Sequence, residues 1–152
     1  MNCEKSVELT VLVIDDQAAM RKIVRSVLRE TGIVNVTTAE NGSVAFEKLT
    51  DPDLEFPDVI VCDLHMDEMS GTEFVHKLRR SKYVKNTDVP VIVLTGESRE
   101  MVLEVTRQVG ADAILRKPVS AEEMREMIES VVGFRLDMHK PCGAASPLQM
   151  VS

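Results

Sequence analysis

The stretch Val59-Ile60-Val61-Cys62-Asp63 decides the fold of this chain, because four apolar residues end in one carboxylate. Pro57-Asp58 precedes the stretch and a polar loop follows it. A short apolar segment between turn signals is typical of a strand buried on both faces, as in a parallel sheet. Asp63 then lies at the carboxyl end of the strand, the edge at which open α/β sheets bind ligands. Taken alone, an Asp after an apolar strand is more often a helix cap or a turn residue than part of a binding site.

Length and composition indicate one domain with a single core. The chain has 152 residues, of which 44% are hydrophobic and 28% charged. It begins without a basic segment followed by a long apolar one, so we expect neither a signal peptide nor a membrane span and place the protein in the cytoplasm. Cys3, Cys62 and Cys142 have no C-x-x-C spacing, which favours neither a disulfide framework nor a zinc site.

The net charge of −7 limits the classes of partner. Nucleic acids and anionic membranes both bind basic surfaces, so an acidic chain is a poor match for either. We therefore expect a protein partner or a metal cation, with no binding to nucleic acid or to a membrane.

The hydrophobic pattern predicts five strands that alternate with five helices. The expected strands are 9–14, 34–39, 59–63, 91–94 and 113–115. Helices follow them, with Asn41 as a cap, S-x-x-E capping boxes at 70–73 and 120–123, and glycines at 32 and 110 as stops. This alternation predicts a right-handed parallel α/β fold. Residues 1–8 read as an arm, 9–134 as the domain and 135–152 as a flexible tail.

Three expectations concern the helix faces. In the first helix, Met20, Ile23, Val24, Val27 and Leu28 share one face by spacing, whereas Arg21, Lys22, Arg25 and Arg29 should point to solvent. The helix at 98–109 has too many apolar residues for one stripe, so some of them should face outward. We expect Met101, Leu103 and Ile114 to form an adaptable partner surface with the last helix.

Polar residues follow four of the expected strands. Asp15-Asp16, Asp63, Thr95 and Lys117 come after the first, third, fourth and fifth strands. In a parallel sheet these positions meet at one edge, so three carboxylates would crowd together and favour a shared cation. Carboxylate oxygens suit Mg²⁺, and the Lys117 ammonium suits a phosphoryl oxygen. The set therefore predicts a site that accepts and senses a phosphoryl group.

These residues resemble the receiver domain of two-component response regulators, in its stand-alone chemotaxis-regulator form. The resemblance covers about residues 9–134 and depends on four motifs in order: Asp15-Asp16, Asp63-Leu64-His65-Met66 with Gly71 after it, Thr95-Gly96, and Gly110-Ala111-Asp112 leading to Lys117-Pro118. It implies a flavodoxin-like (βα)5 fold, a doubly wound five-stranded parallel sheet with strand order 2-1-3-4-5.

The resemblance also implies roles for individual residues. Asp63 would be the phosphoacceptor, and Mg²⁺, or Mn²⁺ in its place, would be held by Asp15, Asp16, Asp63 and the backbone carbonyl of His65. Phosphoryl binding and switching would fall to Thr95, Gly96, Lys117 and Ile114, with Pro118 after a cis peptide bond. His65 and Glu97 would tune dephosphorylation.

The partners implied are a histidine kinase or a histidine phosphotransfer protein as donor, and a protein target that docks on the last two helices and the fifth strand. The protein would be a monomer or a weak phosphorylation-dependent dimer. It would catalyse only its own phosphorylation and dephosphorylation, and would either signal to its target or drain phosphoryl groups as a sink.

Two positions depart from the family pattern. Ile114 stands where the family has a switch aromatic, and Asp67 stands where a proline is usual, which we expect to add negative charge and loosen the backbone. Two alternatives therefore stay open. One is a receiver-fold interaction module that works without phosphorylation. The other is a Mg²⁺-dependent aspartyl phosphohydrolase, although its D-x-D motif is matched neither at Asp15 nor at Asp63.

Overall fold

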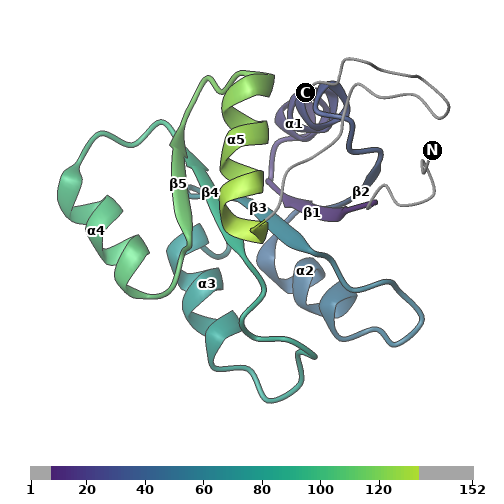
Figure 1. Cartoon of the computed structure of the whole chain (residues 1–152). Helices are drawn as coiled ribbons and strands as arrows, with labels where there is room; N and C mark the ends of the chain where they lie inside the picture. The colour runs from purple at the N-terminus through teal and green to yellow at the C-terminus, as the bar shows by residue number, and fades with distance from the viewer. Residues whose placement is uncertain (1–7, 134–152) are drawn as a thin grey trace, which may run out of the picture.

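A computed structural model describes residues 8–133, which form a parallel sheet with helices on both faces (Figure 1). The predicted arm and tail lie, apart from Glu8, outside the described residues. The strand order is β2-β1-β3-β4-β5, and every neighbouring pair is parallel, which confirms the doubly wound topology. The elements are β1 (Thr10–Ile14), α1 (Ala18–Glu30), β2 (Asn35–Ala39), α2 (Gly42–Leu49), β3 (Val59–Asp63), α3 (Gly71–Arg79), β4 (Val91–Thr95), α4 (Glu100–Gln108), β5 (Ala113–Arg116) and α5 (Ala121–Val132).

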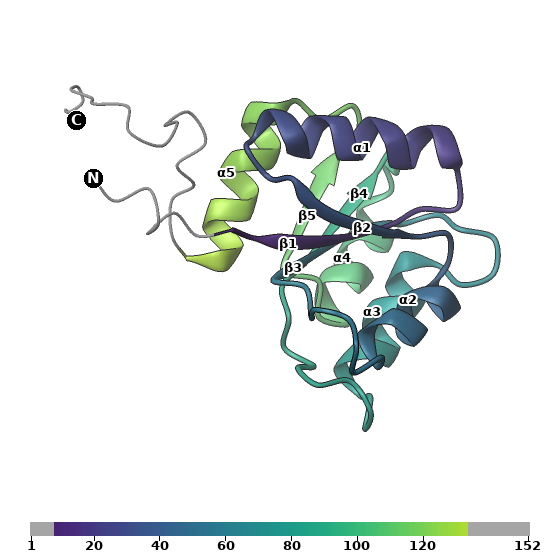
Figure 2. The same cartoon turned by 90° about the vertical axis from the view of Figure 1, so that its right-hand side faces the viewer.

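Alternate residues of the central strands enter two separate core layers. Leu12 and Ile60 face the layer that holds buried residues of α2, α3 and α4, whereas Val11 and Val61 face the layer of α1 and α5. Figure 2 shows α1 and α5 on one side of the sheet and α2 and α3 on the other. Because successive side chains of a strand point to opposite faces, a strand covered on both faces must be apolar throughout.

The helix starts follow the predicted caps. Asn41 and Ser70 each accept a backbone N–H three residues along the chain, at 2.8 and 3.1 Å. Only Ser120 forms the full reciprocal box, in which the Glu123 side chain also accepts the Ser120 N–H at 3.0 Å. Gly32 follows α1 with a φ of 94°, a left-handed conformation that few other residues adopt. Among the described residues, no helix is long and apolar enough to cross a bilayer.

The free edge of β2 is capped by side chains from the flanking helices. Arg25 of α1 donates to the Val36 carbonyl at 3.2 Å, and Lys48 of α2 donates to the Thr38 carbonyl at 2.5 Å. Arg25 is exposed, as the helix spacing predicted, and makes this contact from the solvent side of α1. Occupied edge carbonyls are poor acceptors for another strand, so these two cations protect the sheet edge.

Two predicted apolar faces need correction. Ile23 is 54% exposed, because the side of α1 that meets the sheet is centred on Val24 and Leu28. In α4, Leu103 is only 1% exposed and belongs to the core, whereas Met101 and Val105 are 79% and 43% exposed. The outward apolar surface of α4 thus includes Met101 and Val105 but not Leu103.

Candidate functional site

Three carboxylates meet at the carboxyl edge of the sheet. Asp15 and Asp16 follow β1, and Asp63 ends β3, the neighbouring strand. One carboxylate oxygen from each residue lies within 4.8 Å of the other two. Asp15 and Asp63 are buried, whereas Asp16 is half-buried. This cluster brings together the acids that the sequence placed at one edge, and its oxygen donors match the preference of Mg²⁺.

The electrostatics of the cluster favour a cation. Burial raises the pKa of the Asp15 carboxyl, and repulsion from Asp63 adds to that effect, although a hydrogen bond from the Gln17 N–H opposes it. Lys117 supplies one positive charge, because its Nζ donates to Asp63 Oδ1 at 2.6 Å. The Lys117 backbone N–H is itself held by the Thr95 carbonyl at 2.9 Å. One ammonium does not neutralise three carboxylates, so the site is suited to a divalent ion.

Two backbone contacts that the sequence did not predict support the acids. Arg21 of α1 donates to the Asp15 carbonyl at 2.6 Å, so the expectation that Arg21 only points to solvent is wrong. The Asp67 N–H donates to Asp16 Oδ2 at 3.1 Å. A proline at position 67 would have no N–H to give, so the departure from the family pattern anchors this loop instead of loosening it.

Gly71 is packed against the backbone of the central acid. Its N–H donates to the Leu64 carbonyl at 2.7 Å, and a Cβ at this position would lie 2.5 Å from the Asp63 carbonyl oxygen. Any side chain would therefore push β3 or α3 away. Gly96 differs, because a Cβ there would have no neighbour within 4 Å. Gly71 thus fixes the position of Asp63, whereas in the sequence it was recognisable only as part of a motif.

Thr95 and Glu97 begin a second polar network beside the acids. Thr95 Oγ1 accepts the Glu97 N–H at 2.8 Å. Arg99 donates to the Glu97 carboxylate from Nε at 2.7 Å and from Nη2 at 2.9 Å, and His65 Nε2 lies 3.0 Å from Glu97 Oε1. The Arg99 hydrogen bonds hold the pKa of the Glu97 carboxyl well below its usual range. Arg99, two residues beyond Glu97, is a functional candidate that the sequence did not identify.

The remaining predicted residues lie around this edge. Ile114 of β5 is partly buried and packs against the α2, α3 and α4 core layer. The Lys117–Pro118 peptide bond is cis, in agreement with the resemblance. The metal-binding role of the His65 carbonyl stays a prediction.

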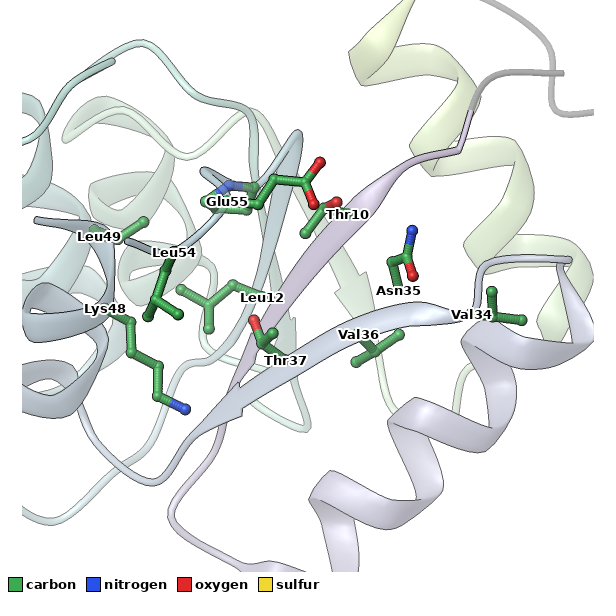
Figure 3. Close-up of a pocket in the computed structure, with 11 residues that line it drawn as sticks. Thr10, Leu12, Val34, Asn35, Val36, Thr37, Lys48, Leu49, Leu54 and Glu55 are labelled. Atoms are coloured by element: carbon green, nitrogen blue, oxygen red, sulfur yellow. The ribbon is translucent and has the colours of Figure 1, made fainter. Parts of the chain in front are cut away.

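A pocket of about 430 Å³ lies elsewhere, between β1, β2 and α2 (Figure 3). Leu12, Leu49 and Leu54 line its apolar part, and Thr10 lies at its wall. The Thr10 hydroxyl is buried with no hydrogen-bond partner in the described part of the chain. None of the acids of the cluster lines this pocket, so it is separate from the candidate site.

Comparison with known families decides which class of domain this site belongs to. The model of the response regulator receiver domain matches residues 11–129. The chain belongs to the response regulator receiver domain family. This receiver is 33% identical over 125 residues to the chemotaxis protein CheY homolog of Campylobacter jejuni. The alignment covers 82% of this chain and 93% of that protein.

Solved receiver structures share its fold. The chemotaxis protein CheY4 of Vibrio cholerae superposes with a TM-score of 0.70 at 30% identity, over 82% of this chain and 99% of that one. The receiver domain of a sensor histidine kinase from Pseudomonas aeruginosa PAO1 superposes with a TM-score of 0.71 at 21% identity, over 84% of this chain and 99% of that one. In that protein a magnesium ion is coordinated in the active-site cleft.

Proposed function

We propose that this receiver takes a phosphoryl group onto Asp63 from a phosphohistidine of a histidine kinase or a histidine phosphotransfer protein. The phosphorus–nitrogen bond of the donor breaks, its imidazole nitrogen keeps the electron pair, and a phosphorus–oxygen bond forms to the Asp63 carboxylate. The observation that carries the proposal is the arrangement around Asp63, with two further carboxylates within 4.8 Å and Lys117 Nζ at 2.6 Å.

The roles of the two Asp63 oxygens follow from the lysine contact. Lys117 engages Oδ1, which leaves Oδ2 as the oxygen that we assign to attack. The ammonium would also lie near the charge that develops on the transferred oxygens, and preorganised cations of this kind are a general means of assisting phosphoryl transfer. Gly71 and the β3 backbone keep the carboxylate at this position.

Mg²⁺ is the cofactor that the donor set fits. Asp15, Asp16 and Asp63 would hold the ion through carboxylate oxygens, and the ion would neutralise charge on the phosphoryl group. Arg21 and the Asp67 N–H keep the Asp15 backbone and the Asp16 carboxylate in place for it.

The output step would begin at Thr95. Its oxygen now accepts the Glu97 N–H, and its hydroxyl proton can turn toward a phosphoryl oxygen on Asp63. Glu97 is hydrogen-bonded to His65 and to Arg99, the residue that precedes α4. A shift of Thr95 would therefore move Glu97 and, through Arg99, the start of α4. The exposed Met101 and Val105 lie on α4, which contacts β5, and form the surface we assign to a protein target.

Relatives with chemotaxis names favour a chemotaxis-type pathway, with a role as phosphoryl sink as the other output. The first experiment is intact-protein mass spectrometry after incubation with acetyl phosphate and MgCl₂. We expect one hydroxylamine-labile phosphoryl group on the wild type, no such group on Asp63→Asn, and no labelling in excess EDTA.

The matched control is Asp53→Asn, which removes the same charge from an exposed position and should be labelled like the wild type. Labelling of Asp63→Asn at the wild-type rate would refute the assignment. If neither acetyl phosphate nor a phosphorylated histidine kinase labels the wild type, an interaction module without phosphorylation replaces this proposal. Turnover of added phosphoesters would instead identify a phosphohydrolase.

A further inference from the structure

Positive charge is concentrated in one segment of this acidic protein. Five of its 18 lysines and arginines lie within residues 77–85, which contain no aspartate or glutamate. The rest of the chain therefore has 13 basic residues against 25 acidic ones. A local charge so different from that of the whole molecule attracts partners that the remaining surface repels.

Three of these five cations line a groove between α2 and α3, which lie side by side in Figure 2. The groove encloses about 810 Å³ and is open to solvent. Lys77, Arg80 and Lys82 line it together with one acidic residue, Glu47, and Lys77 Nζ also lies 3.9 Å from Glu73 Oε2. Arg80 and Lys82 are exposed and form no ion pair within residues 8–133, so both are available to an incoming anion.

The groove also has a rigid apolar part. Phe46 lies at its wall, and its ring packs on the buried Phe74 ring with a centroid distance of 5.0 Å. Tyr83, the only tyrosine of the chain, also lines the groove and is 83% exposed. An aromatic side chain this exposed gains much from burial by a partner, and Tyr and Arg are enriched among residues that dominate binding energy.

Hydrogen bonds and a buried side chain fix the loop that carries Tyr83. The Ser81 hydroxyl accepts the backbone N–H groups of Tyr83 and Val84, both at 3.1 Å, and the Val84 side chain is buried. Arg79 donates to the Thr87 and Val89 carbonyls, both at 2.7 Å. A preorganised loop loses little conformational entropy on binding. Arg79 is used for this structural purpose and is not part of the binding surface.

We propose that the α2–α3 groove is a docking site for an acidic segment of a partner protein. Carboxylates of that segment would pair with Arg80, Lys82 and Lys77, and one of its apolar side chains would pack between Phe46 and Tyr83. The basis is charge complementarity together with the exposed aromatic ring. The site is distinct from the acidic cluster, because the groove takes its cations from the carboxyl-terminal end of α3 and the loop after it, whereas Asp63 packs at Gly71, the first residue of that helix.

Charge decides between a protein segment and a nucleic acid. A short acidic peptide places its charge inside the groove, whereas an extended polyanion would also meet the rest of the protein, which has 13 basic residues against 25 acidic ones. Two helices and a loop, open to solvent, also suit an extended segment better than a small molecule, which binds in an enclosed pocket.

The test is fluorescence anisotropy with a fluorescein-labelled peptide of about eight residues, glutamates around one central phenylalanine, at about 50 and 200 mM NaCl. We expect Arg80→Gln/Lys82→Gln to weaken binding by about tenfold at the lower salt. The matched control is Lys22→Gln/Arg29→Gln, which removes the same charge from exposed positions on α1 and should change Kd by less than about twofold. Tyr83→Ala, which changes no charge, should weaken binding by about fivefold.

Equal losses in the two double variants would show diffuse attraction and overturn the proposal, as would an unaffected Tyr83→Ala or no binding to the wild type. Tighter binding of an oligothymidylate of similar length would identify a nucleic-acid surface instead. Asp63→Asn should bind the peptide like the wild type. The docking proposal and the phosphorylation proposal can therefore be refuted independently of each other.

Discussion

Replacing Asp15 by asparagine should make the metal-free protein more stable. The Asp15 carboxylate lies within 4.8 Å of both Asp16 and Asp63, and each such pair repels by about 3 kcal/mol at an effective dielectric of about 20. Attraction to Lys117 offsets part of this repulsion. Asparagine retains an oxygen for the Gln17 N–H, so the hydrogen bond survives. We expect the free energy of unfolding to rise by about 1 to 2 kcal/mol in EDTA.

The same substitution should weaken the response to Mg²⁺. Binding to the native state alone stabilises the wild type by about 1.4 kcal/mol when Mg²⁺ is at about ten times its Kd. Asp15→Asn removes one carboxylate ligand, so its gain from the same MgCl₂ should be smaller. Urea unfolding, with and without MgCl₂, measures both quantities.

Acid provides a further check on the same variant. The pKa of Asp15 is raised, so in the folded wild type this group takes up its proton at a higher pH than in the unfolded chain. Its repulsion therefore destabilises the wild type at neutral pH and is lost as the pH falls, and the advantage of Asp15→Asn should shrink in parallel. The control Asp53→Asn, on the surface, should stay within about 0.5 kcal/mol of the wild type. An Asp15→Asn protein less stable than the wild type in EDTA would refute the account of a repulsive cluster.

Two further pairs of variants test the packing. Thr10→Val removes a buried hydroxyl without a described partner and should stabilise the fold by about 1 kcal/mol, seen as a Tm about 3 °C higher. Thr106→Val removes a buried hydroxyl that has two partners and should instead cost about 1 to 2 kcal/mol; a Tm change of the same sign in both would contradict the reasoning. Gly71→Ala should destabilise by about 1 to 3 kcal/mol and slow labelling of Asp63, because its Cβ meets the Asp63 carbonyl. Gly96→Ala has room and should stay within about 0.5 kcal/mol of wild type in urea unfolding; equal costs for both glycines would rule out the packing argument.

Most of the fold was predictable because its central strands are covered on both faces. β1, β3 and β4 are buried at every position, and such strands read as uninterrupted apolar segments. The edge strand β2 gave a weaker signal, since its first four residues alternate between exposed and partly buried and only Ala39 is fully buried. Helix faces were predicted less well, because spacing alone does not fix how far a helix rotates about its axis. Ile23 and Leu103 were assigned to the wrong side for that reason.

The acids and Lys117 were predictable from their places after the strands, whereas the residues that support them were not. Arg21, Arg99 and the Asp67 N–H act through single contacts whose existence depends on how a helix or loop crosses the sheet edge. A weak signal existed for Arg21, which lies in the first turn of α1 just after Asp15. Nothing in the spacing separated it from the other basic residues of that helix.

By itself, the sequence determined that a parallel sheet forms and that Asp15, Asp16, Asp63, Thr95 and Lys117 share one edge of it. Strand burial and the direction of parallel strands impose this arrangement, whatever the details of packing. Only the tertiary structure decided which atoms touch, because hydrogen bonds and close contacts depend on shifts of an ångström or less between elements. It placed Lys117 against Asp63, packed Gly71 against the Asp63 carbonyl, and brought the cations at the end of α3 and in the loop after it into one groove with Tyr83.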